Sequence, residues 1–332
     1  MLNYQKTYFD PSALPAFAKV RNNPDRDDWA YDAGASVEAT RRHFVFAEEA
    51  ILAINVALAT RRPLLVSGEA GSGKTSLARF AAAALGRVFY RETVTSRTQA
   101  SDLLSSFDAL RRLSHAQLKN KLLPEQAYVV PGKFWWAISP KSAAQRGLKA
   151  QKGQAALEDP GLYPTRKGAR QAALLLDEID KADPDVPNDL LESLDERSFT
   201  VQETGDRITP ERDDVLIFLT TNGERELPPA FLRRCVTIEL PKPDKRWLVE
   251  VAERQFGTGS GPFKDALYDR LAQEVMELRA SADAQGRRPP STSEFVDAVA
   301  TCSKLLDEKW VDRDAAQLRT LLDTVLSKGV RS

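Results

Sequence analysis

Short, wholly apolar runs alternate with longer amphipathic segments along the first two thirds of the chain. Such runs have the length of strands and leave no polar position to face water, which is typical of strands buried on both faces of a parallel sheet. The clearest runs lie at 64–66, 172–176 and 215–219, with further candidates at 87–91 and 236–240, and a helix is expected at 47–59. Strands that alternate with helices predict an α/β fold built on a doubly wound, five-stranded parallel sheet.

The pattern changes to helices alone after Pro241 and Pro243. Apolar positions at helical spacing are expected to form helices at roughly 245–255, 263–280, 292–306 and 313–326. We therefore expect an extended N-terminal arm at 1–45, a sheet domain at 46–242 and a small all-α domain at 243–332.

The sheet domain carries three segments that the strand pattern does not explain. A helical region is expected at 103–118, and two apolar arms around Pro131-Gly132 predict a hairpin at 128–136, where Trp135 and Trp136 are either core residues or a partner-facing tip. A second hairpin is expected to join 198–202 to 207–209. Residues 141–170 hold seven Lys or Arg against two acidic residues, and are expected to be a flexible basic insertion that is either a solvated loop or a functional contact.

The first apolar run leads into a glycine-rich loop with the spacing G-x-x-x-x-G-K-[ST], which predicts binding of nucleotide phosphates. Glycines let the backbone turn so that its N–H groups face phosphate oxygens, and the following helix adds the positive end of its dipole. Lys74 is expected to reach the β- and γ-phosphates, and the Thr75 hydroxyl to bind Mg²⁺. The expected cofactor-binding residues are Gly68, Glu69, Ala70, Gly71, Ser72, Gly73, Lys74, Thr75 and Ser76.

Two further polar sites follow buried strands. Asp177 and Glu178 end the run at 172–176, and Asn222 follows the run at 215–219. At the same sheet edge as a phosphate loop, Asp177 is expected to hold Mg²⁺ and Glu178 to polarise the water that attacks the γ-phosphate. Asn222 is expected to orient that water. Since a glutamate of this kind serves water rather than another acceptor, the pattern predicts hydrolysis of a nucleoside triphosphate.

Composition restricts the partners and the compartment. Of 332 residues, 42% are hydrophobic and 28% charged, and the 47 basic residues balance the 47 acidic ones, so any site for an anionic partner must be local. No apolar run approaches the ~20 residues of a membrane span, so no membrane partner is expected. Cys235 and Cys302 are expected to be buried thiols of a cytoplasmic protein.

Together these motifs resemble the AAA+ ATPases, and within them the MoxR-like group. The resemblance rests on 68–75, on 174–182 with 186–197, on 98–104 and on 220–222 with 227–235. In addition, 130–134 resembles the helix-two insert that defines the clade, and 197–213 resembles the hairpin before its sensor strand. It implies ATP as the nucleotide, Walker A at the loop, Walker B at Asp177 and Glu178, and sensor 1 at Asn222. It also implies that Arg234, with Arg233 as a rival, is an arginine finger that completes a neighbouring subunit's site, and therefore a ring, commonly a hexamer. The group acts on protein partners, often ones with a von Willebrand factor A domain.

The chain departs from the MoxR-like pattern in several places. Lys133 stands where a proline is usual, and the sensor 2 arginine is missing from 289–294, so Arg288, next to Arg287, is only a weak substitute in the cofactor-binding set. The basic stretch at 141–170 is longer than usual, and the arm at 1–45 has no counterpart. Two other functions stay open: a nucleic-acid-associated motor that uses 141–170, and a nucleotide-gated scaffold that turns over slowly.

Overall fold

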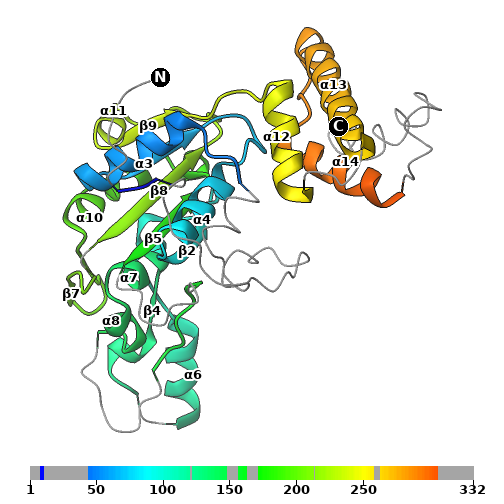
Figure 1. Ribbon diagram of the computed structural model, residues 1–332. Helices are drawn as coiled ribbons and strands as arrows, with labels where there is room; N and C mark the ends of the chain where they lie inside the picture. The colour runs from blue at the N-terminus through cyan, green and yellow to red at the C-terminus, as the bar shows by residue number, and fades with distance from the viewer. Residues whose placement is uncertain are drawn as a thin grey trace.

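The computed structural model describes residues 8–10, 44–119, 122–147, 156–162, 171–212, 214–257 and 262–305. Its centre is a five-stranded sheet in which every neighbouring pair is parallel, as expected (Figure 1). The strand order is β2 (Val88–Thr93), β5 (Ala172–Asp177), β8 (Val215–Thr221), β1 (Leu64–Ser67) and β9 (Val236–Glu239). Each parallel neighbour needs a crossover connection.

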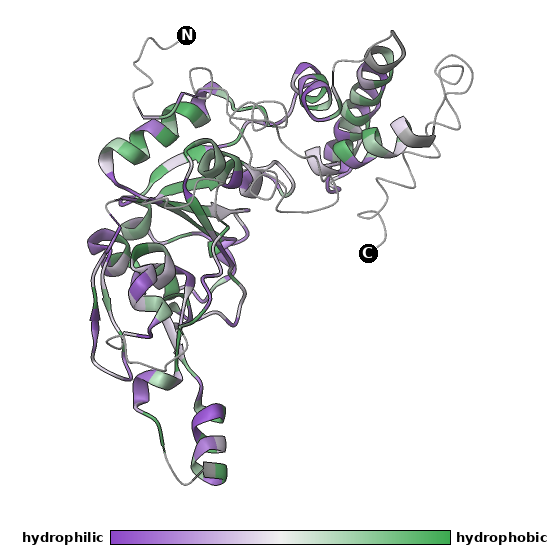
Figure 2. Ribbon diagram, turned by 60° about the horizontal axis from the view of Figure 1, so that its bottom comes forward, coloured by the Kyte–Doolittle hydropathy of each residue, from purple (hydrophilic) through white to green (hydrophobic). Residues whose placement is uncertain are grey.

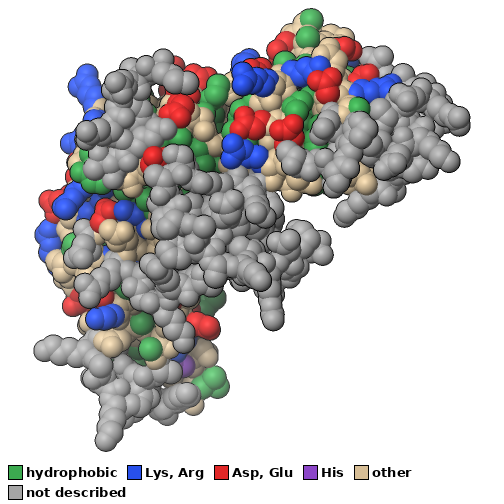
Figure 3. All heavy atoms as spheres, viewed as in Figure 1, with side chains coloured by type: hydrophobic (Ala, Val, Ile, Leu, Met, Phe, Trp, Pro, Cys, Tyr) green, Lys and Arg blue, Asp and Glu red, His purple; other side chains and the backbone are tan. Residues whose placement is uncertain are grey.

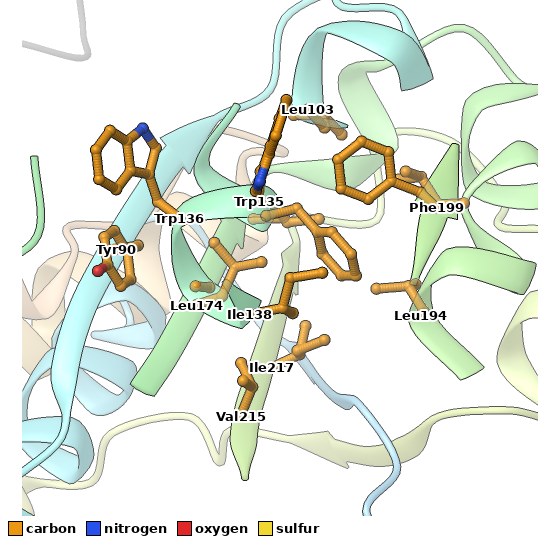
Figure 4. Packing of buried hydrophobic residues seen from close by; sticks show 14 of the residues in the cluster. Tyr90, Leu103, Trp135, Trp136, Ile138, Leu174, Leu194, Phe199, Val215 and Ile217 are labelled. Atoms are coloured by element: carbon orange, nitrogen blue, oxygen red, sulfur yellow. The ribbon is translucent and has the colours of Figure 1, made fainter. Parts of the chain in front are cut away.

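Helices cover both faces of the sheet. On one face, α3 (Glu48–Thr60) and α4 (Lys74–Ala84) bury alternate strand residues such as Leu175 and Phe218. On the other face, Leu174 and Ile217 pack beneath α7 (Lys133–Ile138) (Figure 4). The central strands β5 and β8 are accordingly buried at every position, and the strands at the centre of the sheet are mostly hydrophobic in Figure 2. This is why the sequence shows unbroken apolar runs there rather than alternation.

The predicted hairpin at 128–136 is wrong. Val129–Pro131 forms β4, which pairs antiparallel with β3 (Ser105–Phe107), and the residues after Gly132 form α7. The expected helix at 103–118 is divided for the same reason, into α5 (Ala100–Leu104), β3 and α6 (Ala109–Lys119). A side chain at Gly132 would lie 2.6 Å from the carbonyl carbon of Leu103, so glycine here permits close backbone contact rather than a tight hairpin turn.

Trp135 and Trp136 both belong to the core. They project from α7 among residues of the sheet, of α5 and of the second hairpin (Figure 4). Trp135 is fully buried, contacts Phe199 edge-on and donates from Nε1 to Ser142 Oγ over 3.2 Å. Neither ring is available as a partner-facing tip.

The second hairpin is confirmed as β6 (Phe199–Thr200) paired with β7 (Arg207–Ile208). The short elements of the domain are the 3₁₀ turns η1 (Glu125–Tyr128) and η2 (Ile179–Lys181) and the helices α8 (Pro140–Ala144), α9 (Val186–Asp189), α10 (Leu191–Glu196) and α11 (Pro229–Leu232). Residues 148–155 and 163–170 of the basic insertion, and most of the arm at 1–45, lie outside the described residues. The described parts of the insertion are not a flexible loop, since its start belongs to α8 and Leu162 forms a β-bridge with Phe89.

One described piece of the arm is built into the core. Phe9 is fully buried and packs against Phe46 and α3. Asn55 of α3 accepts hydrogen bonds from the backbone N–H groups of Tyr8 and Phe9 and donates to the Phe9 carbonyl. A buried polar side chain that satisfies backbone groups in this way holds the segment in place.

Among the described residues, three helices follow the sheet and form the lid, the name used below for α12 (Lys245–Phe256), α13 (Pro262–Ala284) and α14 (Thr292–Leu305). They share a separate core around Leu248, Tyr268 and Phe295, which includes Cys302. The helix expected at 313–326 lies outside the described residues. Acidic and basic side chains are interspersed on the lid face seen in Figure 3. In the described part of the chain, no helix is long and apolar enough to cross a bilayer.

Candidate functional site

The loop at 68–75 connects the carboxyl end of β1 to the first turn of α4. Gly71 and Gly73 have φ angles of +75° and +96°, which side chains other than glycine rarely adopt. Lys74 is buried, and its Nζ donates to the carbonyls of Gly68 and Glu69, each over 2.8 Å. Burial desolvates this ammonium and lowers the pKa of Lys74, although the nearby carboxylates act in the opposite direction. Ala70 is exposed at the loop surface, and Ser76 lies in the first turn of α4.

Asp177 lies at the carboxyl end of β5 and is brought to the loop as expected. Thr75 Oγ1 donates to its two oxygens over 3.1 and 3.0 Å. Two other residues, which the sequence did not single out for a role, also hold this carboxylate: Arg91 of β2 donates over 2.8 Å, and Thr220 of β8 donates through its hydroxyl. Asp177 is thus positioned from three sides.

Glu178 and Asn222 also meet. Asn222 Nδ2 donates to Glu178 Oε1 over 3.2 Å, and Lys181 Nζ donates to Oε2 over 2.8 Å. The bond to Glu178 raises the pKa of Lys181. Glu178 itself has φ +62°, a left-handed conformation that is uncommon outside glycine and is concentrated at functional sites. Its N–H donates to Thr220 Oγ1, so the same threonine fixes Glu178 and Asp177.

Asp180 holds the backbone beside the Glu178–Asn222 pair. It is buried and accepts hydrogen bonds from the backbone N–H groups of Asn222 and Glu224, over 3.2 and 2.9 Å. Asp180 therefore fixes the loop that presents Asn222 to Glu178. Its position two residues after Glu178 was visible in the sequence, but nothing there predicted the long-range bonds.

Arg234 lies at the amino ends of the strands, whereas the loop lies at their carboxyl ends. It precedes β9, and its carbonyl accepts a hydrogen bond from Arg62, just before the amino end of β1. The four residues of β1 put about 13 Å of strand between that end and the loop. The Arg234 side chain is half-exposed and donates to Asp195 over 2.7 Å. The structure therefore does not bring Arg234 to the loop of its own chain. Arg233 lies beside it at the end of α11.

The lid contacts the loop through residues other than the expected Arg288. Arg288 is half-exposed and donates to Glu294 within the lid over 3.5 Å. Arg279, near the carboxyl end of α13, instead donates to Glu69 over 2.7 Å. The sequence offered no signal for Arg279, because a single arginine on an amphipathic helix is ordinarily a surface residue.

The residues at this edge suit a nucleoside triphosphate with a divalent cation. Ser72 Oγ is buried and has no hydrogen-bond partner among the described residues, and the Lys74 ammonium is buried beside it in the loop. Thr75 and Asp177 present adjacent oxygens, the ligand type that Mg²⁺ prefers. No cluster of three or more His, Cys, Asp or Glu in the described ranges is arranged to hold a metal ion by itself, so Mg²⁺ would depend on phosphate and water for its remaining ligands.

Comparison with known proteins agrees with this geometry. The sequence profile of the family described as AAA domain (dynein-related subfamily) matches residues 63–235, which is more than half of the chain. No curated protein matches the chain.

Among solved structures, a candidate ATPase of Cytophaga hutchinsonii is 19% identical with a TM-score of 0.42, over 80% of this chain and 71% of that chain. The RuvB Holliday junction branch migration motor of Thermotoga maritima is 17% identical with a TM-score of 0.46, over 87% of this chain and 73% of that chain. Likeness at this level carries no argument about function. Because the family match spans the phosphate loop, Asp177, Glu178 and Asn222 in one domain, the chain belongs to the AAA domain family, in its dynein-related subfamily, and so to a class of nucleotide-binding ATPases.

Proposed function

We propose that the chain hydrolyses ATP with Mg²⁺ and uses the reaction to remodel a protein partner. In this proposal Lys74 binds the β- and γ-phosphates, while Thr75 and Asp177 hold the metal, which neutralises charge on the phosphate oxygens. Glu178 accepts a proton from the attacking water, and Asn222 orients that water.

One observation carries the proposal. Thr75 lies 102 residues from Asp177 in the sequence, and Glu178 lies 44 residues from Asn222, yet a hydrogen bond joins each pair at the carboxyl ends of the strands. Ligand sites of open parallel sheets lie at this edge. A phosphate loop alone would fit a kinase or a scaffold, but a carboxylate paired with an amide beside it supports water activation.

We further propose that the site is completed by a second copy of the chain. Arg234 is half-exposed at the amino ends of the strands, opposite the loop. The nucleotide it would serve is therefore one bound at a neighbouring subunit's loop. A guanidinium that neutralises charge in a phosphoryl-transfer transition state accounts for a large part of the rate in related chemistry. This arrangement supports a closed ring, commonly a hexamer in the MoxR-like group.

The surface of α6 favours a protein partner over nucleic acid. α6 lies at the end of the molecule away from the lid (Figure 1), and Leu110, Leu113 and Leu118 on it are 81%, 55% and 79% exposed. Apolar side chains in such a cluster mark protein contacts rather than phosphate contacts. We therefore propose a protein substrate, with a von Willebrand factor A domain protein as the partner class that the MoxR-like resemblance suggests.

The variant Glu178→Gln tests the proposed chemistry. The amide keeps the size of the side chain and can still bond to Asn222, but it cannot accept a proton. ATP turnover should fall by about 10² to 10⁴, while ATP affinity and assembly stay unchanged. Turnover is measured by phosphate release and affinity by equilibrium titration.

Glu192→Gln, an exposed carboxylate on α10, is the matched control and should leave turnover unchanged. Full turnover in the Glu178→Gln variant would refute the assignment of Glu178. Absence of ATP binding by the unaltered chain would refute the proposed function as a whole.

A further inference from the structure

Glu69, the second residue of the phosphate loop, is held by two cations that lie outside the loop. Arg279 of the lid donates to Oε2 over 2.7 Å, and Lys242, between β9 and α12, lies 3.1 Å from Oε1. Arg279 is 8% exposed and Lys242 is 70% exposed. A charge-assisted bond to a nearly buried arginine is the stronger of the two interactions.

The lid contacts the loop at a second place beside this pair. Ser293 Oγ of α14 lies 3.4 Å from the Gly71 carbonyl, and a side chain at Gly71 would meet Ser291 Oγ at 2.7 Å. Arg279 also donates to the carbonyl of Pro290, just before these serines. Arg279 thus links the loop, its own helix and the turn that begins α14, so a displacement of the lid would break its bond to Glu69.

We propose that Arg279, acting through Glu69, is the positioning residue that couples the lid to the phosphate loop, so that lid position and nucleotide affinity depend on each other. This inference rests on the proposed binding of ATP at the loop.

The physical reason is the charge on Glu69. Although desolvation raises the pKa of Glu69, hydrogen bonds from Arg279 and Lys242 outweigh it and hold the pKa below its ordinary value, so the side chain stays a carboxylate. A carboxylate in a loop that must receive a triphosphate repels it, unless cations compensate that charge. Lid displacement removes Arg279 and leaves the exposed Lys242 as the remaining cation of the two that compensate the charge of Glu69. By linkage, a triphosphate that binds better when Arg279 is present must also hold the lid in place.

We therefore expect substitutions of Arg279 and of Glu69 to have opposite effects on ATP affinity. Arg279→Ala should weaken ATP binding about tenfold, because Glu69 then repels the triphosphate. Glu69→Gln should bind ATP at least as tightly as the unaltered chain, because the repelling charge is gone. The double variant should bind more tightly than Arg279→Ala alone. In both single variants the lid should be displaced from the loop.

The experiment uses the full chain with fluorescent labels on α10 and α12, energy transfer to report lid position, and equilibrium titration with ATP to report affinity. Arg254→Ala, which breaks an exposed pair with Glu250 on α12, is the matched control and should change neither readout. Since a nearly buried arginine also contributes to folding, Arg279→Lys and the exposed Lys242→Ala are included. Arg279→Lys should restore most of the affinity, and Lys242→Ala should lower it less than Arg279→Ala does, by a salt-dependent amount.

A purely structural role would weaken ATP binding in Glu69→Gln and Arg279→Ala alike, and that result would overturn the inference. Unchanged affinity in Arg279→Ala would also overturn it. Either result leaves the proposed function intact, provided that the unaltered chain binds ATP; if the unaltered chain does not, the proposed function fails first.

Discussion

The contact between Gly71 and Ser291 provides a direct perturbation of the lid. Replacing Gly71 by alanine adds one methyl group where the loop meets the turn before α14. The new carbon would lie 2.7 Å from Ser291 Oγ and nearer still to Ser291 Cβ, whereas ordinary van der Waals contact begins at 3.4 Å. Because packed groups do not interpenetrate, the turn must move away by roughly 1 Å.

Two costs of this variant are separable. Alanine at φ +75° is strained by about 1 to 2 kcal/mol wherever it occurs. The collision with the lid is a second cost that depends on Ser291 alone. Gly73→Ala carries a comparable strain at φ +96°, but its nearest neighbour, Phe44, would be 3.9 Å away. Gly73→Ala is therefore the matched control for strain without collision.

Lid position is measured by energy transfer between labels on α10 and α12, and stability by urea unfolding. Gly73→Ala should lower the free energy of unfolding by about 1 to 2 kcal/mol and Gly71→Ala by more, and only Gly71→Ala should displace the lid. Adding Ser291→Gly removes both colliding atoms and should return the lid to its place. The loss of the Ser291 cap on α14 costs only a few tenths of a kcal/mol. Equal lid displacement in the Gly71→Ala and Gly73→Ala variants, or no recovery with Ser291→Gly, would refute this reasoning.

Two further predictions concern other parts of the molecule. Arg234→Ala should reduce ATP turnover by about 10³ or more when measured by phosphate release, and mixing it with Glu178→Gln chains should restore part of the rate, since each chain supplies what the other lacks. No recovery on mixing would count against an intersubunit site, and Arg233→Ala tests the rival arginine. Asn55→Ala should lower the free energy of unfolding by about 3 kcal/mol, because the buried N–H and C=O of Phe9 lose their partner. The neighbouring, partly exposed Val56→Ala is its control in the same urea titration, and equal losses in the two variants would show that Asn55 does not anchor the arm.

Much of the sheet could be predicted from the sequence because its cause is local. A strand buried on both faces must be apolar at every position, and 172–176 and 215–219 meet that condition without reference to the rest of the chain. The expected meeting of the loop with Asp177 and Asn222 follows from the same point, since the carboxyl ends of parallel strands share one edge.

The errors fall where a residue's partner is distant. Pro131-Gly132 has the composition of a hairpin turn, but Val129–Pro131 pairs with Ser105–Phe107, and Gly132 serves the close approach of Leu103. The helical pattern at 103–118 did not reveal a three-residue strand, because so short a segment has no period of its own. In both cases tertiary pairing overrode the local preference.

The residues that support the site could not be predicted from the sequence, for a similar reason. Arg91 and Thr220 hold Asp177 from neighbouring strands, and Arg279 reaches Glu69 across 210 positions of chain. No motif spacing joins residues so far apart, and each of them alone is an ordinary polar residue.

The sequence by itself determined the α/β class, the phosphate loop and the carboxylates at the strand end, because backbone conformation, burial periodicity and phosphate chemistry act over a few neighbouring residues. Only the tertiary structure decided which arginine of the lid meets the loop, and that Arg234 lies at the edge opposite its own loop. Those outcomes depend on how separate elements dock, and docking is set by the shape and charge of whole surfaces rather than by any short stretch of the chain.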